Sequence, residues 1–149
     1  MSVRRFAAVT ALLALVPLVA AADEYRNAKT PSGPKVAWIA MYLNAKSTDP
    51  RLVKLRGYTP AQVEVHVGDH IVFTNIDDEV HTATLRLADG FPATAMKASG
   101  HNISDAWSTG DVKPSGESPP ILADKPGTYM YGCVHHIGDG QLGSIVVDP

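Results

Sequence analysis

The most regular feature of the chain is the alternation of apolar and polar residues in QVEVHV, which starts at residue 62. In an extended chain Val63, Val65 and Val67 lie on one face, and the polar residues between them lie on the other. The Gly-Asp pair that follows is a turn signal, and it leads into a second apolar run, IVFTN. The pattern therefore predicts a β-hairpin over residues 62–75, with one face buried and the other in contact with water.

Other short apolar runs predict further strands. The run KVAWIAMYL has the length of a strand, although a helix over residues 36–46 is a competing interpretation, because periodicity does not separate the two in so short a run. The segment RLVKLRGY predicts a short strand or sheet edge at residues 51–58. A pair of apolar positions follows at residues 82–87, and two clear strand sequences, GTYMYGC and GSIVVD, lie near the C-terminus.

A long segment between these strands, residues 88–120, is rich in Gly, Pro, Ser, Ala and Asp. It predicts a loop with short extended pieces, anchored by its bulky residues Ile103 and Trp107. Short strands separated by turns are typical of antiparallel sandwiches and small barrels, and 149 residues give room for one domain of ordinary size. We therefore expect an all-β fold in a single domain.

The first 22 residues predict a secretory signal peptide, because two arginines precede an apolar run that ends in small residues before Asp23. A retained N-terminal anchor is the alternative, since the run is near the lower length limit of a membrane span. Cleavage gives a periplasmic or otherwise exported protein of about 127 residues. Residues 23–50 then form an N-terminal extension or linker with a candidate first strand, and residues 51–149 form the main domain.

The charge of the chain argues against nucleic-acid binding. Removing Arg4 and Arg5 from the 13 basic residues leaves 11 against 15 acidic residues, a net charge of −4, whereas nucleic-acid-binding domains carry basic patches. The single cysteine cannot form an internal disulfide. It is therefore a buried apolar residue, an intermolecular link, a nucleophile or a metal ligand.

The stretch YGCVHHIGDGQLG, residues 131–143, holds that cysteine, two histidines and a glutamine. If its two ends are strands, Cys133 is the last residue of the first strand, and His136 and Gln141 lie on the connecting loop. A second histidine, His81, follows a polar corner, and antiparallel packing brings it to the same end. A thiolate with two imidazoles and a weak axial Met or Gln is the ligand set of a type 1 copper centre, although zinc also suits two histidines and a cysteine.

Other histidines and methionines fit such a site less well. His135 falls outside the Cys-x2-His spacing and is expected at the surface beside the site. Met130 is an odd number of positions from Cys133, so its side chain should point away from the metal. Three further histidines are expected at the surface: His66, His70 and His101.

The chain resembles cupredoxins of the plastocyanin and pseudoazurin kind over residues 58–147. The resemblance rests on the segment Tyr-x-Pro-x2-Val-x-Val-x2-Gly-Asp, on a histidine after an acidic corner, and on Pro-Gly-x-Tyr-x-Tyr-x-Cys-x2-His. The matching positions are Tyr58, Pro60, Gly68, Asp69, His81, Pro126, Gly127, Tyr129, Tyr131, Cys133, His136 and Gly143. The resemblance implies a Greek-key cupredoxin β-sandwich or barrel that binds one copper ion per chain through His81, Cys133 and His136.

The axial position departs from this resemblance, because plastocyanins have methionine where this chain has Gln141. Stellacyanin-like cupredoxins use glutamine there, so the departure is compatible with copper binding. An amide oxygen is a harder donor than a thioether and favours Cu(II). We therefore expect a green or perturbed blue centre with a reduction potential below that of a methionine site.

The resemblance also implies a function, that of a periplasmic electron carrier. Such a carrier is a monomer, is not an enzyme, has no membrane span after signal cleavage, and exchanges electrons with a redox protein such as a cytochrome or a copper enzyme. Copper handling or copper tolerance at the same site is the alternative function. Copper enzymes couple a type 1 centre to a second copper through a histidine adjacent to the cysteine, but Gly132 and Val134 flank Cys133 here.

Overall fold

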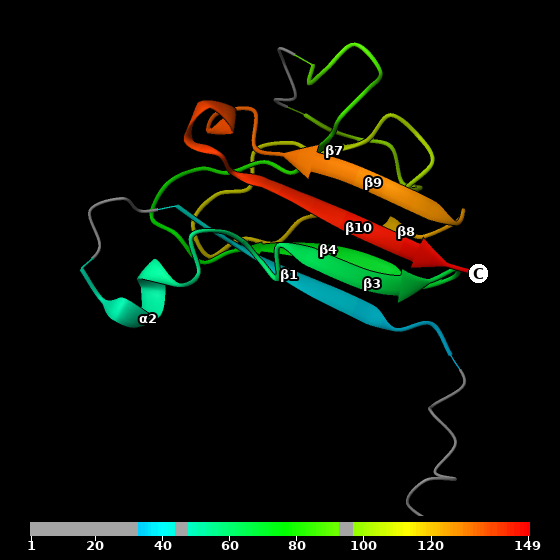
Figure 1. Ribbon diagram of the computed structural model, residues 1–149, viewed down its shortest axis with the longest axis horizontal. Coiled ribbons are helices and arrows are strands. Elements are labelled where there is room, and N and C mark those ends of the chain that lie inside the picture. Colours follow the sequence, from blue (N-terminus) through cyan, green and yellow to red (C-terminus); the bar gives the residue numbers. More distant parts are fainter. Residues whose placement is uncertain (1–32, 44–47, 93–96) are drawn as a thin grey trace, which may run out of the picture. The chain divides into compact units, whose positions relative to one another are not determined.

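The computed structural model describes residues 33–43, 48–92 and 97–149. The elements in chain order are β1 (Val36–Tyr42), α2 (Pro50–Val53), β2 (Gly57–Thr59), β3 (Gln62–His66), β4 (His70–Asn75), β5 (Thr84–Leu85), β6 (Ala98–Ser99), β7 (Ser108–Thr109), β8 (Ile121–Leu122), β9 (Gly127–Gly132), the 3-10 helix η1 (Ile137–Asp139) and β10 (Leu142–Asp148). Most of these elements are strands, which confirms the expected all-β class (Figure 1). No helix within the described ranges is long and apolar enough to cross a membrane.

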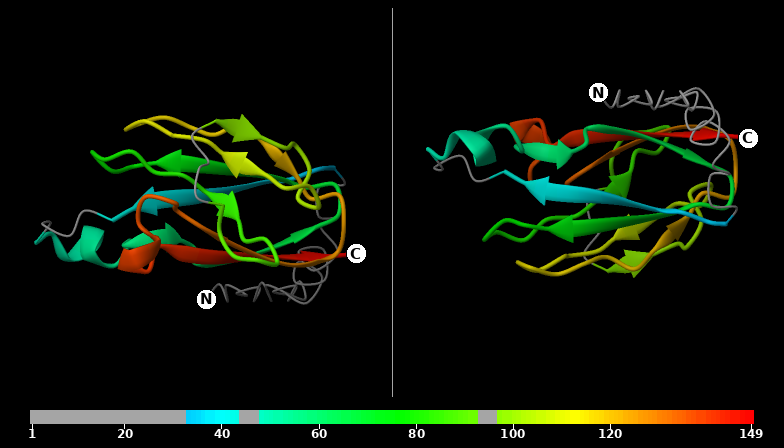
Figure 2. Two further views of the ribbon diagram at one scale, coloured as in Figure 1. Left: turned by 90° about the horizontal axis from the view of Figure 1, so that it is seen from above. Right: turned by 90° about the horizontal axis from the view of Figure 1, so that it is seen from below.

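The strands form two sheets (Figure 2). One sheet has four strands in the order β2-β1-β4-β8, and the other has six in the order β3-β10-β9-β5-β7-β6. Two pairings are parallel, β1 with β4 and β3 with β10, and the others are antiparallel. Because β3 and β4 lie in different sheets, as do β8 and β9, the chain crosses repeatedly from one sheet to the other. This arrangement is the expected cupredoxin β-sandwich.

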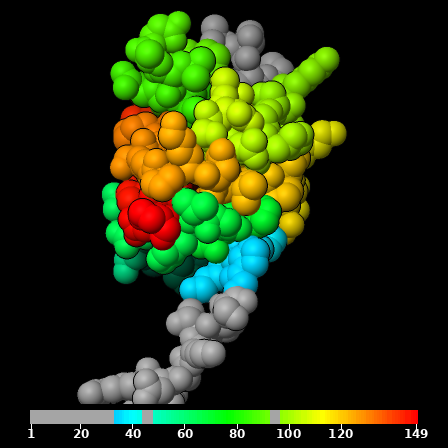
Figure 3. All heavy atoms as spheres, turned by 90° about the vertical axis from the view of Figure 1, so that its right-hand side faces the viewer, coloured from blue at the N-terminus to red at the C-terminus, as the bar shows by residue number. Residues whose placement is uncertain are grey.

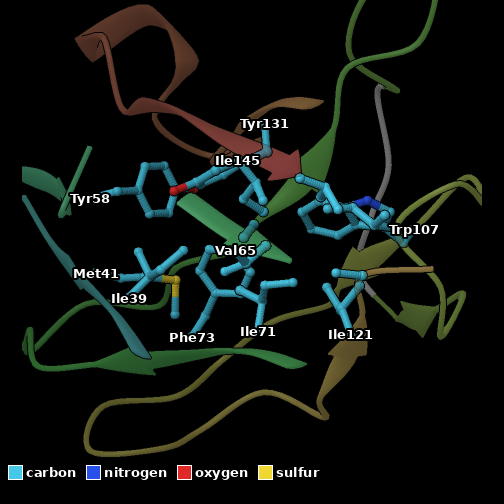
Figure 4. Packing of buried hydrophobic residues seen from close by; sticks show 14 of the residues in the cluster. Ile39, Met41, Tyr58, Val65, Ile71, Phe73, Trp107, Ile121, Tyr131 and Ile145 are labelled. Atoms are coloured by element: carbon cyan, nitrogen blue, oxygen red, sulfur yellow. The ribbon is translucent and has the colours of Figure 1, made fainter. Parts of the chain in front are cut away.

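The core lies between the two sheets, where apolar side chains from both meet (Figure 4). Four aromatic rings lie at its centre, with neighbouring ring centroids 4.7 to 6.1 Å apart: Tyr58, Phe73, Trp107 and Tyr131. Trp107 comes from the long loop segment, and Ile103 of the same segment is also buried. The prediction that these two residues anchor the loop is therefore confirmed.

The hairpin predicted over residues 62–75 does not form. β3 pairs with β10, whereas β4 pairs with β1 and β8 in the other sheet. Val65 and Phe73 therefore reach the same core from opposite sheets. The alternation correctly predicted that Val65 is buried and that Glu64 is exposed, but Val67 lies beyond the end of β3 and is 46% exposed. An alternating pattern indicates which face of a strand is buried but not which strand supplies its hydrogen bonds.

Only the end of the segment predicted as a strand at residues 51–58 is extended. The segment begins within the short helix α2, and pairing starts only at β2. Pro50 occupies the first turn of the helix, and the Asp49 carboxylate accepts a hydrogen bond from Arg51 N–H at 2.9 Å. Both features favour a helix start, so the Asp-Pro pair begins a helical turn rather than a strand.

The N-terminal strand β1 is an interior strand of its sheet, with β2 on one side and β4 on the other. The run KVAWIAMYL is therefore extended over its strand residues, and not helical. Residues 44–46 of the competing helix lie outside the described residues. So do residues 1–32, which include the predicted signal peptide and the start of the predicted extension.

The corner after β4 and the loop after β9 lie at the same end of the domain (Figure 1). Figure 3 views the opposite end, where the last residues of β10 lie beside β3 and β9. The fold thus brings residues 76–82 and 133–141 together, although about 50 positions separate them in the sequence.

Candidate metal centre

The corner that carries His81 is held by two buried polar side chains, Asn75 and Asp77. Asn75 Nδ2 donates hydrogen bonds to two main-chain carbonyl oxygens, at 2.7 and 2.8 Å. The Asp77 carboxylate accepts hydrogen bonds from two main-chain N–H groups, also at 2.7 and 2.8 Å. The main chain of His81 itself pairs with that of Val112. These bonds fix the backbone of the corner and hence the place of the buried His81 imidazole.

The loop between β9 and β10 closes through main-chain hydrogen bonds. Cys133, directly after the last residue of β9, donates its N–H to the Gln141 carbonyl at 3.1 Å. The N–H of Gln141 donates to the His136 carbonyl at 3.2 Å, and that of His136 donates to the Cys133 carbonyl at 3.0 Å. Gly140 caps the end of η1, and its φ of 79° lies in the left-handed region that glycine adopts readily. These bonds therefore hold the main chains of Cys133, His136 and Gln141 close to one another.

Three side chains from the corner and the loop converge on one point. The Sγ of Cys133 lies 3.4 Å from Nδ1 of His136 and 3.9 Å from Nδ1 of His81. One donor atom from each residue lies within 4.8 Å of the other two. Cys133 and His81 are fully buried, while the His136 side chain is 17% exposed. One sulfur and two nitrogen donors are thus positioned to bind one metal ion.

The surroundings of Cys133 favour its thiolate form. Burial alone would raise the pKa of the thiol, but hydrogen bonds from His81, from Thr82 N–H and from His136 outweigh burial and lower the pKa to about 6. The Thr82 N–H donates to Sγ at 3.3 Å, and the Thr82 hydroxyl oxygen accepts from Val134 N–H at 3.0 Å. The thiolate is the form of cysteine that binds metals, and as a soft ligand it suits copper.

Gln141 contributes a fully buried amide next to this cluster. Its Nε2 donates to the Gly57 carbonyl at 3.3 Å, whereas its Oε1 has no hydrogen-bond partner among the described residues. A buried acceptor without a partner destabilises the fold, because it has lost its hydrogen bonds to water. A metal ion is one partner that would compensate for this loss. Together with one thiolate and two imidazoles, this oxygen fits the donor set of a type 1 copper ion.

Each imidazole of the cluster has a carboxylate beside its other nitrogen. His81 Nε2 lies 2.8 Å from Asp77 Oδ2, and both side chains are 0% exposed. His136 Nε2 lies 3.5 Å from Glu79 Oε2, whose side chain is 60% exposed. Burial alone would raise the pKa of Asp77, but hydrogen bonds from main-chain N–H groups and from His81 outweigh it and lower the pKa. The buried Asp77 carboxylate in this position orients the His81 ring with Nδ1 toward the thiolate.

The remaining candidates are not part of the cluster, although the His135 ring centroid lies 6.3 Å from that of His136, beside the site as expected. The Nε2 of His135 is 2.8 Å from Asp111 Oδ1, and the His135 side chain is 32% exposed. Met130 is 45% exposed, which agrees with the prediction that it points away from Cys133. His66 and His101 are exposed and His70 is half-buried, and none of the three belongs to the metal-binding group found among the described residues.

Among the residues of the site that had no predicted role, Asp77 and Thr82 make the closest contacts with the cluster. Asp77 lies four positions before His81 in the acidic corner, and this spacing was the available signal. Thr82 acts mainly through its main-chain N–H. Every residue except proline has a main-chain N–H group, so the presence of threonine at position 82 did not indicate this role.

Comparison with known proteins agrees with this chemistry. Residues 48–148 match the family described as copper binding proteins, plastocyanin/azurin family. The chain is 30% identical over 150 residues to a chloroplastic plastocyanin of Tetradesmus obliquus, with 98% of each chain covered. It is similar in structure to a purple cupredoxin from Nitrosopumilus maritimus, with a TM-score of 0.53 and 16% identity over 75% of this chain and 99% of that chain. It is also similar to a pseudoazurin from Sinorhizobium, with a TM-score of 0.50 and 27% identity over 77% of this chain and 75% of that chain. The chain therefore belongs to the plastocyanin/azurin family of copper-binding proteins.

Proposed function

We propose that this protein is an electron carrier in which His81, Cys133, His136 and Gln141 would hold one type 1 copper ion. The observation that carries the proposal is the buried Cys133 sulfur, which lies 3.4 and 3.9 Å from two imidazole nitrogens. When bound, copper supplies the one-electron couple Cu(II)/Cu(I). The protein's part is to supply these donors in a fixed arrangement and to keep water away from the thiolate.

The rigidity of the site supports electron transfer. Main-chain hydrogen bonds close the loop from Cys133 to Gln141, and the corner of His81 is tied by two buried polar side chains. Ligands held on rigid elements move little when the charge of the metal changes. The reorganisation that accompanies each electron transfer is therefore small.

The exchange of electrons with a partner is proposed to take place at His136. This is the only one of the three clustered residues with an exposed side-chain surface, at 17%. The half-buried Ile137 follows it in the loop, and Leu142 at the start of β10 is 40% exposed. A partly apolar face around a ligand imidazole suits brief contact with a redox protein such as a cytochrome or a copper enzyme.

The proposed cellular setting rests on the sequence. Residues 1–22 serve as a signal peptide and residues 51–149 as the main domain, while residues 23–50 form an extension whose strand β1 completes a sheet of that domain. The mature protein then works as a periplasmic monomer. It is proposed to be a carrier rather than an enzyme, because the neighbours of Cys133 are Gly132 and Val134 and offer no histidine to a second copper.

The visible absorption spectrum of the copper-loaded protein tests this function. We expect an intense thiolate-to-Cu(II) band that bleaches on reduction, together with rapid electron exchange with a cytochrome. Cu(II) binding without that band would contradict the type 1 proposal. A normal band with slow electron transfer, and copper-sensitive growth of a deletion strain, would instead favour copper handling or copper tolerance.

Replacing the axial residue should raise the reduction potential. In Gln141→Met a soft thioether takes the place of the amide oxygen, so Cu(I) is favoured relative to the wild type. We expect an increase on the order of 59 mV, the equivalent of a tenfold change in the affinity ratio of the two oxidation states. Gln62→Met is the matched control, since the other glutamine of the chain is exposed on β3. A potential of Gln141→Met at or below that of the wild type would exclude an axial role for this oxygen.

A further inference from the structure

We propose that Asp77 is a positioning residue that strengthens His81 as a copper donor and lowers the reduction potential of the site. The inference rests on the proposed function and adds a determinant of the potential that does not touch the metal. The Oδ2 of Asp77 lies 2.8 Å from Nε2 of His81, and both side chains are 0% exposed. No water competes with this hydrogen bond at the surface of either group.

The hydrogen bond selects one form of the His81 ring. An imidazole that donates from Nε2 presents its lone pair at Nδ1, and Nδ1 is the nitrogen that lies 3.9 Å from the Cys133 sulfur. A carboxylate acceptor also increases the basicity of the ring, because it stabilises positive charge on the donating nitrogen. Asp77 therefore both aims His81 at the metal position and makes it a stronger donor.

The other contacts of Asp77 show that its side chain acts as an acceptor. Its two oxygens accept hydrogen bonds from Leu43 N–H at 2.7 Å and from Asp78 N–H at 2.8 Å, in addition to the bond with His81. Acceptance from three donors suits an ionised carboxylate, which has no proton to donate. A buried negative charge so close to the site stabilises Cu(II) more than Cu(I), because Cu(II) carries the larger positive charge.

Among the described residues, the other two carboxylate–histidine pairs at this end of the domain are more exposed than the Asp77–His81 pair. Glu79 is 3.5 Å from His136 and its side chain is 60% exposed, so water screens its charge. Asp111 contacts His135 at 2.8 Å, the same distance as the buried pair, but the two side chains are 31% and 32% exposed. Asp111 thus offers a control of the same residue type, at the same distance from the nitrogen of a histidine outside the cluster.

The test compares Asp77→Asn with Asp111→Asn in the copper-loaded protein. Outer partners of metal ligands are typically worth about 10- to 100-fold in metal affinity. We expect Cu(II) affinity to fall by about this factor in Asp77→Asn with little change for Cu(I), so that the potential rises by about 59 mV for each tenfold loss. Asp111→Asn should keep the wild-type potential. Equal potentials in the two variants would overturn the inference.

A measurement on the wild type keeps the inference testable if Asp77→Asn does not fold. In the diamagnetic Cu(I) protein, nitrogen-15 NMR should show His81 protonated at Nε2, with that proton protected from exchange with water. A His81 ring without a proton at Nε2 would overturn the proposed role of Asp77. The visible band of the wild type distinguishes a failure of the proposed function from a failure of the proposed role of Asp77. Absence of the band contradicts the proposed function itself. A normal band with an unshifted Asp77→Asn potential contradicts only the role of Asp77.

Discussion

Cys133→Ser should abolish the visible band of the copper-loaded protein completely. The chain has no other cysteine, so no second thiolate can give rise to a sulfur-to-copper transition. A serine hydroxyl is a hard, weakly acidic ligand, and it replaces the one soft donor of the cluster. Copper affinity should therefore fall by more than the about 10- to 100-fold typical of an outer partner. Absorption spectra and competition with a chromogenic chelator measure both effects.

The adjacent histidines provide the controls for this result. His136→Ala removes a donor that lies 3.4 Å from the Cys133 sulfur, whereas His135→Ala removes a ring that contacts Asp111 instead. The band should be lost or strongly shifted in the first variant and retained in the second. A Cys133→Ser protein that keeps the band, or a His135→Ala protein that loses it, would refute the assignment of the donors.

Gly143→Ala should destabilise the protein, although it adds only one methyl group. A Cβ at this position of β10 would lie 2.5 Å from Cζ and from Oη of Tyr131. The Tyr131 ring cannot withdraw easily, because its centroid lies 4.7 Å from that of Tyr58 and 5.1 Å from that of Phe73. Overpacking of this kind costs about 1–3 kcal/mol, which corresponds to a fall in Tm of about 4–12 °C at roughly 4 °C per kcal/mol.

Gly138→Ala is the matched control for this steric argument. A Cβ at Gly138 meets no atom within 4 Å, and the residue does not have a positive φ. Its alanine variant should therefore unfold at or slightly above the wild-type temperature. Thermal unfolding followed by circular dichroism compares the two variants. Equal Tm values would mean that the aromatic cluster can shift to accept a methyl group.

The strands and the buried anchors of the long loop could be predicted from local patterns in the sequence. Alternation in QVEVHV correctly indicated a strand with Val65 inside, and bulky residues in a polar segment indicated the anchors Ile103 and Trp107. The pairing of strands could not be predicted in the same way. β3 pairs with residues Ser144–Asp148, far along the chain, and an alternating pattern contains no information about so distant a neighbour.

The residues of the site also differ in how far the local sequence predicts them. Cys133, His136 and Gln141 lie within nine consecutive residues, so their spacing alone placed them on one loop. His81 lies 52 positions before Cys133, so its place in the site was predicted from the expected antiparallel packing and then from the resemblance to a known family. For Asp77 the sequence offered only its four-residue spacing from His81, because its role depends on a hydrogen bond with that side chain and on burial that only the packed structure defines.

The place of β1 inside its sheet has a consequence for how the chain can be shortened. The family match begins at residue 48, but a protein cut there would lose a strand that hydrogen-bonds to neighbours on both sides. The cut would turn β4 into an exposed edge, and uncovered edges recruit strands from other molecules. It would also remove the Leu43 N–H that holds Asp77. A fragment chosen by family boundaries alone would therefore be expected to aggregate, so the minimal soluble unit should start no later than residue 34.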